Sequence, residues 1–295
     1  MIRPVVTHPV HRIRGFDASA ILKTLEYVIP RLDEPVPEVD GYGICCVAGG
    51  KYLRYAHRMV RIVREMSDMP IHIYHLGPKE LDHPVVPVLR EMGVTFKDAL
   101  PLMAARNYQT GNPGWMAKSA SLIDVPFRHC LFLDADAYPL IPPEDIFAHG
   151  DYTTGLVVFP DVAPCRKSDA FFSAFGMRHD PLFTEWEAGQ FVVDKVRLWD
   201  AVQLYAFMNG RPKPFHEIFW GDKDLLPMAC IRLGIPFTTG RPPQWIKRVA
   251  LRHFLSDETP AFEHWMEEKR GKLWLPERLL ELDREFRNIT QLTTV

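Results

Sequence analysis

Short apolar runs alternate with segments of helical periodicity between residues 43 and 96. An apolar run flanked by polar residues is typical of a buried strand, whereas apolar residues at three- and four-residue steps predict an amphipathic helix. The expected strands are Gly43–Ala48, Ile71–Leu76 and Val94–Phe96, and the expected helices are Lys51–Met66 and Val85–Met92. This β-α-β-α-β order predicts a parallel sheet with right-handed crossovers.

The rest of the chain shows the same two patterns less regularly. Asp17 suits the N-cap of a helix over Phe16–Ile29, because a carboxylate can accept hydrogen bonds from the first turn. Further strands are expected at Cys130–Leu133, Leu156–Phe159, Phe191–Val193 and Val249–Phe254. Further helices are expected at Trp115–Val125, Asp145–Phe147 and Val196–Met208. Another helix is expected to end at Leu233, and residues 260–290 are expected to form two charged helices. Residues 98–114 and 160–186 are expected to be irregular.

These elements predict an α/β protein with a Rossmann-like, mixed and mostly parallel sheet flanked by helices. The predicted organisation is an N-terminal extension over residues 1–40, one main domain over residues 41–255, and a C-terminal helical cap over residues 256–295.

Composition narrows the kinds of partner. The 295 residues are 47% hydrophobic and 24% charged, and the formal net charge is -2, so no global field attracts nucleic acid or acidic membranes. The sequence contains no apolar run of about 18 residues, the length typical of a transmembrane helix, and no apolar core of a signal peptide. The five cysteines form no C-x-x-C pair. We therefore expect free thiols and a cytoplasmic location.

The predicted strand Cys130–Leu133 leads directly into two carboxylates, Asp134 and Asp136. Residues two apart at the end of a strand point to the same side, so the two side chains can converge. Two like charges at close range are costly unless a cation lies between them, and oxygen ligands suit Mg²⁺ or Mn²⁺. The pattern favours a metal site at the mouth of a parallel strand. The alternative is an acidic turn that Pro139 ends.

Three other features of the sequence have an ordinary structural interpretation beside a functional one. Gly49 and Gly50 follow a predicted strand, where glycine lets the backbone approach a ligand but also suits a tight turn. Lys118 precedes the acidic strand by one helix and could reach a phosphate or a sugar, although a solvated helix lysine is the more ordinary interpretation. Asp222 is well placed as the N-cap of the helix that ends at Leu233.

Five segments, taken in order, resemble the nucleotide-sugar glycosyltransferases with a GT-A fold. They are Lys118, Leu131-Phe-Leu-Asp-Ala-Asp136, Glu187-Ala-Gly-Gln190, Trp220-Gly-Asp-Lys-Asp224 and His253. The sequence is most similar to the retaining glycogenin-like and yeast-type α-mannosyltransferase families. The resemblance covers roughly residues 43–255, and the Asp-Ala-Asp and Gly-Asp-Lys-Asp blocks are its most specific parts.

The resemblance implies a metal site. Asp134 and Asp136 would hold a divalent ion, Mn²⁺ or Mg²⁺, against the diphosphate of the donor, and His253 would complete the shell of ligands. After this histidine the family continues with Gly and a Lys-Pro-Trp segment, whereas this sequence continues with Phe-Leu-Ser-Asp-Glu.

The resemblance also implies residues that bind donor and acceptor. Ala48, Gly49 and Tyr52 would hold the nucleoside, and Lys118 would contact the donor sugar or phosphate. Gln190 and Asp222 would lie around the anomeric carbon and the acceptor hydroxyl.

The implied activity is a metal-dependent transfer of a sugar from a UDP- or GDP-sugar to a hydroxyl acceptor, expected to be a carbohydrate, with retention of anomeric configuration. The leaving diphosphate needs positive charge, and the acceptor hydroxyl needs polar groups that orient it. Two alternatives remain open. One is a haloacid dehalogenase-like phosphohydrolase with Asp134 as nucleophile. The other is a non-catalytic nucleotide-sugar-binding module, in which nucleotide binding would need no metal.

Overall fold

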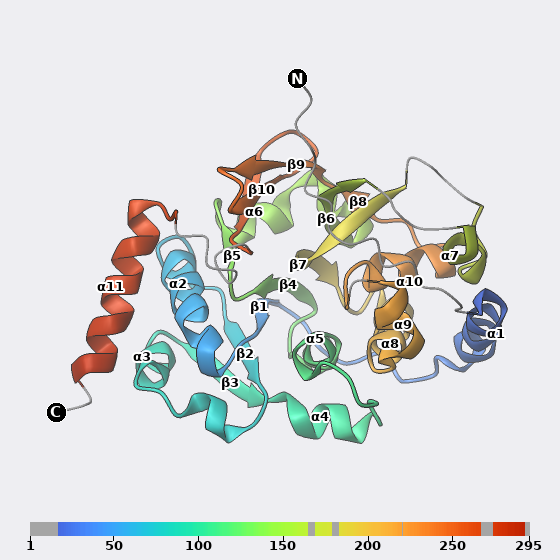
Figure 1. The fold of residues 1–295 in the computed structure, drawn as a ribbon, viewed down its shortest axis with the longest axis horizontal. Coiled ribbons are helices and arrows are strands. Elements are labelled where there is room, and N and C mark those ends of the chain that lie inside the picture. Colours follow the sequence, from blue (N-terminus) through green and yellow to red (C-terminus); the bar gives the residue numbers. More distant parts are fainter. Residues whose placement is uncertain (1–16, 165–168, 179–182, 220, 267–273, 293–295) are drawn as a thin grey trace.

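The structure, a computed structural model, describes residues 17–164, 169–178, 183–219, 221–266 and 274–292 (Figure 1). The helices are α1 Ala18–Val28, α2 Leu53–Arg64, α3 Val85–Glu91, α4 Ala99–Ala105, α5 Pro113–Asp124, α6 Pro143–Ala148, α7 Asp169–Ala174, α8 Trp199–Asn209, α9 Pro212–Ile218, α10 Leu225–Leu233 and α11 Glu277–Leu292. The strands are β1 Tyr42–Val47, β2 Ile71–His75, β3 Val94–Asp98, β4 His129–Asp134, β5 Ala137–Pro139, β6 Leu156–Pro164, β7 Thr184–Asp194, β8 Thr238–Thr239, β9 Arg241–Ile246, β10 Ala250–Phe254 and β11 Pro260–His264. Within the described ranges, no helix is both long enough and apolar enough to cross a membrane.

The main sheet has the strand order β3-β2-β1-β4-β7-β6-β8. Strands β3, β2, β1 and β4 are parallel neighbours, and β7 runs antiparallel to both β4 and β6. The register places Val47 at the end of β1 beside Asp134 at the end of β4, and Gln190 of β7 beside Leu133. Three strands therefore bring residues to the same edge of the sheet. The predicted mixed, mostly parallel α/β fold is confirmed.

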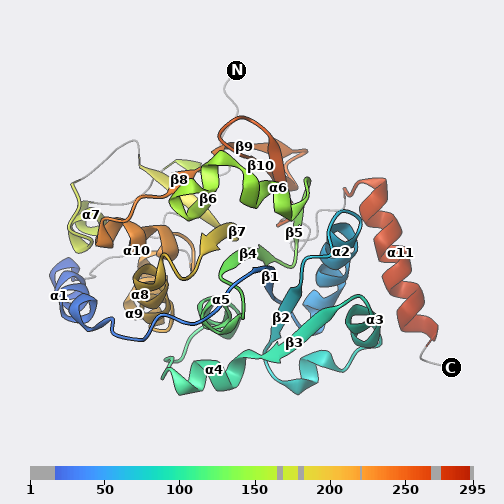
Figure 2. The same ribbon diagram turned by 180° about the vertical axis from the view of Figure 1, so that it is seen from behind.

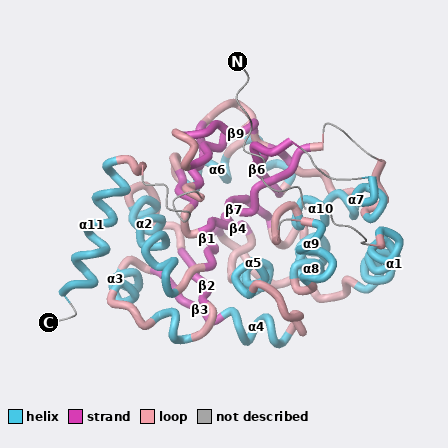
Figure 3. The backbone as a smooth tube through the Cα atoms, viewed as in Figure 1, coloured by secondary structure: helices cyan, strands magenta, loops and turns pink. Residues whose placement is uncertain are grey.

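Helices cover both faces of the main sheet (Figures 1 and 2). Helices α2, α3 and α11 lie on one side, and α5, α8 and α10 lie on the other. Side chains alternate between two cores, so that Cys45 and Phe132 face α5 and α8 whereas Cys46 and Leu133 face α2. Figure 3 shows the strands running through the middle of the molecule with helices to either side. Burial on both faces explains why β1 and β4 are continuous apolar runs.

A second, antiparallel sheet has the order β5-β11-β10-β9. Strand β5 begins just after the end of β4, and its pairing with β11 places His264 opposite Ala137. The backbone N–H of Trp265 donates to the carbonyl oxygen of Asp136 at 2.9 Å. The second sheet therefore holds residues of β11 next to the turn that carries Asp136.

Two segments that were predicted to be irregular contain regular structure. Residues 99–105 form α4, because the Asp98 carboxylate accepts a hydrogen bond from the N–H of Leu100 at 2.9 Å and so caps a helix. Within residues 160–186, β6 continues to Pro164, α7 follows, and β7 begins at Thr184. Cys165 and Trp220 lie outside the described residues.

The prediction of two helices within residues 260–290 is wrong for the first of them. Residues 260–264 form β11, because they pair with β10 in an antiparallel hairpin. The second predicted helix corresponds to α11. At the other end of the chain, Asp17 caps α1 as predicted, through hydrogen bonds from the N–H groups of Ser19 and Ala20. Ile21 and Leu25 of α1 are buried in the core that includes α8. The limits of the extension and of the cap stay predictions.

Candidate functional site

Asp134, Asp136 and His264 form a group at the end of β4. One ligand atom from each residue lies within 4.8 Å of the other two. Asp136 is fully buried, and its Oδ1 lies 3.6 Å from Nε2 of His264. The two carboxylates thus lie close together, as their spacing predicted, and a histidine from the second sheet joins them.

His264 lies between two carboxylates. Its Nδ1 is 3.4 Å from Oε2 of Glu187, whereas its Nε2 faces Asp136. Burial alone would lower the pKa of His264, but the charges of Asp136 and Glu187 raise this pKa to about 10. In this structure the imidazolium therefore supplies positive charge to an acidic group of residues.

The three residues fit a divalent ion. Carboxylates suit Mg²⁺ and Mn²⁺, and an imidazole shifts the preference toward a transition metal. Of the two predicted ions, Mn²⁺ therefore fits this set better. An ion held by Asp134, Asp136 and His264 would take over the charge that the imidazolium now supplies, while Glu187 would fix the orientation of the ring.

His253, the predicted third ligand, is not brought into this group. It lies on β10 opposite Phe262, and its buried ring packs edge-on against Phe159 with the ring centroids 5.9 Å apart. Burial, followed by the charge of His264, lowers the pKa of His253 to about 3, so its ring is neutral. The geometry favours His264 over His253 as the third ligand.

Lys118 joins two carboxylates. Its Nζ lies 2.8 Å from Oδ1 of Asp134 and 3.0 Å from Oδ2 of Asp222, and it donates to the carbonyl oxygen of Ala188 at 3.2 Å. The residue is only 7% exposed, so the interpretation as a solvated lysine is wrong. Burial alone would lower the pKa of Lys118, but Asp134 and Asp222 raise it. The side chain is therefore a fixed cation beside Asp134.

Asp222 is part of this site and not a helix cap. Helix α10 begins at Leu225, and its N-cap residue is Asp224, which has a φ of 65°. The carboxylate of Asp222 is buried against Lys118 instead. Burial raises its pKa, and the charge of Asp134 adds to this effect, against the opposing influence of Lys118.

Each residue of the segment Glu187–Gln190 meets the site in a different way. Glu187 pairs with His264, and the carbonyl of Ala188 accepts from Lys118. A Cβ atom on Gly189 would lie 2.5 Å from the His264 ring, so a larger residue would displace the imidazole. Gln190 is fully buried, and neither its amide oxygen nor its amide nitrogen has a hydrogen-bond partner among the described residues. Buried polar atoms of this kind are costly, which makes Gln190 a candidate for contact with a ligand.

Ala48 and Gly49 follow Val47, the last residue of β1, which pairs with Asp134. The N–H of Ala48 donates to the carbonyl of Tyr74 at 2.9 Å, and a Cβ atom on Gly49 would lie 2.3 Å from a carboxylate oxygen of Glu80. Close packing against Glu80 is thus sufficient to explain why this position is a glycine. Tyr52 ends the following 3₁₀ turn and is 37% exposed. The predicted contact of these residues with a nucleoside stays a prediction.

Sequence reasoning missed His264 and the pairing of Glu187 with it. A signal was present, because the turn-forming residues Ser256 and Asp257 separate the predicted strand Val249–Phe254 from the apolar pair Ala261–Phe262. Two such runs around a short polar segment indicate a hairpin. That hairpin would have placed both histidines, His253 and His264, on neighbouring strands.

Known sequences match the part of the chain that carries Lys118, Asp134 and Asp136. Residues 41–186 match the model of a family described as "Mannosyltransferase putative". The chain is 30% identical over 152 residues to α-1,2-mannosyltransferase MNN2 of Saccharomyces cerevisiae, which is 49% of this chain and 25% of that protein. It is 29% identical over 153 residues to α-1,2-mannosyltransferase MNN24 of Candida albicans, which is 49% of this chain and 21% of that protein. The matches thus span a quarter or less of the length of these two relatives.

Solved structures with partial similarity include two glycosyltransferases. The galactosyltransferase LgtC, in complex with donor and acceptor sugar analogues, aligns with a TM-score of 0.48 and 15% identity over 68% of this chain and 73% of that chain. Mouse xyloside xylosyltransferase 1 aligns with a TM-score of 0.47 and 13% identity over 68% of this chain and 85% of that chain.

The predicted resemblance to mannosyltransferases is confirmed at the level of sequence: over residues 41–186, which include Lys118, Asp134 and Asp136, the chain is similar to the putative mannosyltransferase family.

Proposed function

We propose that the protein is a glycosyltransferase that moves a hexose, with mannose best supported, from a nucleotide-diphosphate donor to a hydroxyl group of a carbohydrate acceptor. The similarity to mannosyltransferases over residues 41–186 supports sugar transfer. The observation that carries the proposal is the group formed by Asp134, Asp136 and His264, with the Lys118 ammonium 2.8 Å from Asp134. This arrangement suits a reaction in which a diphosphate leaves.

The first requirement of this reaction is positive charge at the leaving group. Asp134, Asp136 and His264 would hold the divalent ion, which when bound would neutralise charge on the diphosphate. Lys118 is buried and charged beside Asp134, and it would add a second, fixed positive charge. Because the ammonium is already held by Asp134, Asp222 and Ala188, little reorganisation would be needed as the bond breaks.

The second requirement is orientation of the acceptor. Asp222 has a buried carboxylate with a raised pKa, and it would orient the acceptor hydroxyl and accept its proton. Gln190 would hold a sugar hydroxyl through its amide, whose two polar atoms have no partner in the described residues. We propose retention of anomeric configuration on the resemblance to retaining families, and we assign no covalent nucleophile.

A thermal-shift panel of UDP-, GDP- and other nucleotide sugars, with and without Mn²⁺, tests this function. A ligand that binds the native state must stabilise it by mass action, so we expect GDP-mannose or another single donor to raise Tm only when Mn²⁺ is present. Transfer from that donor to a mannoside, with the product anomer assigned by NMR, then tests the reaction. Stabilisation by a nucleotide sugar without metal and without transfer would favour the binding module. Release of phosphate from an aryl phosphate would favour the phosphohydrolase.

A further inference from the structure

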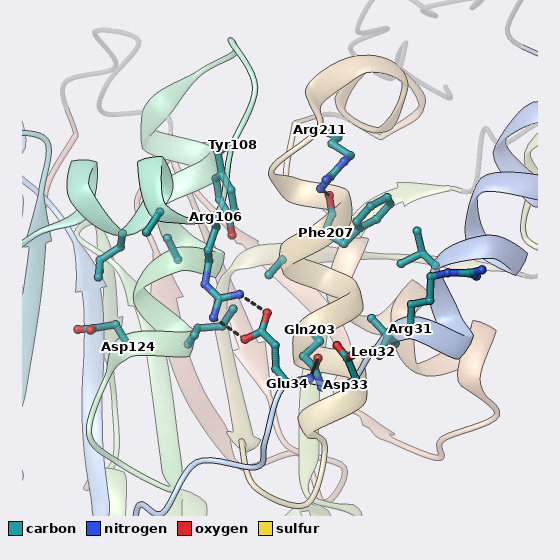
Figure 4. Close-up of a pocket in the computed structure, with 16 residues that line it drawn as sticks. Arg31, Leu32, Asp33, Glu34, Arg106, Tyr108, Asp124, Gln203, Phe207 and Arg211 are labelled. Carbon is teal, nitrogen blue, oxygen red and sulfur yellow. Dashed lines mark hydrogen bonds and ion pairs between the residues drawn. The ribbon is translucent and has the colours of Figure 1, made fainter.

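A groove separate from the carboxylate group lies along the outer side of α5 (Figure 4). Its volume is about 580 Å³, within the range of roughly 300–1,000 Å³ typical of small-molecule sites. Helices α4, α5 and α8 and residues 28–34 form its walls. Ala120 lines the groove, and residues two apart on a helix point in nearly opposite directions, so Lys118 points away from it. Helix α5 therefore separates the groove from Asp134.

The charged side chains of the groove are balanced in sign. They are Arg31, Arg106, Arg211, Asp33, Glu34 and Asp124. Arg106 donates two hydrogen bonds of 2.7 Å to Glu34, a pair that Figure 4 shows inside the groove. Asp124 accepts from Lys97 and from the hydroxyl of Tyr74. A balanced lining does not create the strong positive field that favours a phosphate or a nucleotide, so the groove suits a neutral ligand.

One buried amide in the groove, that of Gln203, is only half satisfied. The amide oxygen of Gln203 accepts from the N–H of Glu34 at 3.1 Å, but its nitrogen has no hydrogen-bond partner among the described residues. Gln203 is only 5% exposed. An unsatisfied buried donor is costly and calls for an explanation. A ligand with an acceptor oxygen would satisfy it.

Two half-buried aromatic rings complete the lining. Phe207 has the guanidinium of Arg211 stacked 3.9 Å from its ring centroid. Tyr108 has its hydroxyl hydrogen-bonded to the Ser119 hydroxyl at 2.9 Å, so the ring is held in place at the end of the groove seen in Figure 4. Fixed aromatic rings offer apolar area at a low entropic cost. The groove therefore combines apolar aromatic rings with the planar hydrogen-bonding groups of Arg106, Glu34 and Gln203.

We propose that this groove is a non-catalytic binding site for a neutral carbohydrate. A sugar carries hydroxyl oxygens that can accept from the Gln203 amide, and hydroxyl groups that can share the hydrogen bonds of Arg106 and Glu34. Its C–H faces can pack on the part of the Phe207 ring that Arg211 does not cover. The Arg106–Glu34 pair is partly exposed, with side-chain exposures of 26% and 42%, and exposed ion pairs are weak. Sugar hydroxyls can therefore join it without a large loss. The site would hold a part of a glycan away from the reacting sugar.

The choice of mannosides as probes rests on the proposed function, whereas the existence of the site does not. Binding is therefore measured without metal and without donor, by saturation-transfer NMR and calorimetry, with methyl α-mannoside and an α-linked mannotriose. We expect saturable binding of the mannotriose. The variants Gln203→Met and Phe207→Leu should each bind it about tenfold more weakly. Gln244→Met, on the exposed strand β9, and Asp136→Asn, beyond α5, should bind it like the unmodified protein.

The two proposals fail in different ways. Loss of sugar transfer in Asp136→Asn, with mannotriose binding kept, supports a groove that is distinct from the reaction site. Mannotriose binding that Asp136→Asn abolishes, or that Gln203→Met and Phe207→Leu both leave unchanged, would place the sugar elsewhere and overturn the inference. Absence of binding by both probes, or binding of free GDP or UDP in the groove, would also overturn it. If Gln203→Met does not fold, as judged by thermal unfolding, Phe207→Leu alone decides between these outcomes.

Discussion

Two groups of charged residues in this protein, each built around a buried carboxylate, differ in their balance of charge. Between α2 and α11, Arg54 and Arg58 both donate to Asp283 through Nε at 2.8 Å and through Nη2. Two guanidinium groups therefore share one carboxylate. Asp283 is only 2% exposed. This group joins two helices and has no excess of negative charge.

The group at the end of β4 has the opposite balance. Among the described residues, four carboxylates, those of Asp134, Asp136, Glu187 and Asp222, lie within 4 Å of two cationic side chains, Lys118 and His264. Lys223 also attracts Glu187, but it is paired with two further carboxylates, those of Asp161 and Glu185. Buried carboxylates in excess repel each other. A protein that maintains such an arrangement accepts a cost to stability, which a bound cation would offset. The comparison indicates that charge balance, more than burial, distinguishes a binding site from a structural ion pair.

The largest expected effect is on transfer in Asp136→Asn. We expect kcat/KM to fall by at least about 10³-fold, because the site loses charge that serves the leaving diphosphate. The free energy of unfolding should change by less than about 1 kcal/mol, because the substitution removes one of several like charges and leaves His264 paired with Glu187. A transfer assay and urea denaturation measure the two effects. Full turnover by Asp136→Asn in the presence of a chelator would contradict the metal role.

The matched substitution in the other group, Asp283→Asn, should show the reverse. Fully buried Arg58 would lose the carboxylate that neutralises it, and loss of one partner from a buried ion pair costs about 3–5 kcal/mol. The rate of transfer, measured well below the unfolding temperature, should stay unchanged. An Asp283→Asn protein as stable as the unmodified one would show that charge balance does not separate the two groups.

The parts of the fold that sequence predicts well are those whose signal is local. Strands β1 and β4 are continuous apolar runs, and α2 has a complete amphipathic period. Asp134 and Asp136 lie two residues apart, so their closeness follows from strand geometry alone. The cap residue Asp17 likewise acts within its own first turn.

The parts that sequence did not predict depend on contacts between distant segments. His264 reaches Asp136 only because β11 pairs with β5 on one side and β10 on the other. Lys118 is buried because Asp134, Asp222 and Ala188 surround its ammonium, whereas a lysine in an isolated helix would be solvated. The choice between His253 and His264 likewise needs strand pairing that the residue types do not specify.

A smaller effect is expected from Glu187→Gln, which keeps the shape of the side chain and removes its charge. Partners that orient a metal-binding histidine typically contribute 10- to 100-fold to metal affinity, so we expect Mn²⁺ to bind about 10- to 100-fold more weakly. Calorimetry with Mn²⁺ and no donor measures this directly. Glu185→Gln is the matched control, because Glu185 lies two residues away on β7 and pairs with Lys223 at 3.0 Å. Equal losses in both variants would indicate a general effect of charge.

The smallest expected effect is the dependence of stability on acidic pH that Asp283 contributes. Burial by itself would raise the pKa of Asp283, but hydrogen bonds from Arg54 and Arg58 lower it below its ordinary value. A lowered pKa in the folded state contributes stability above the unfolded pKa of about 3.9, and this stability is lost as the pH falls through the folded pKa. The difference in unfolding free energy between the unmodified protein and Asp283→Asn should therefore be constant near neutral pH and shrink below about pH 4. Urea denaturation across this range measures it, with Asp200→Asn, an exposed carboxylate on α8, as the control. A difference that persists unchanged well below that pH would mean that the arginines do not hold Asp283 in its charged form.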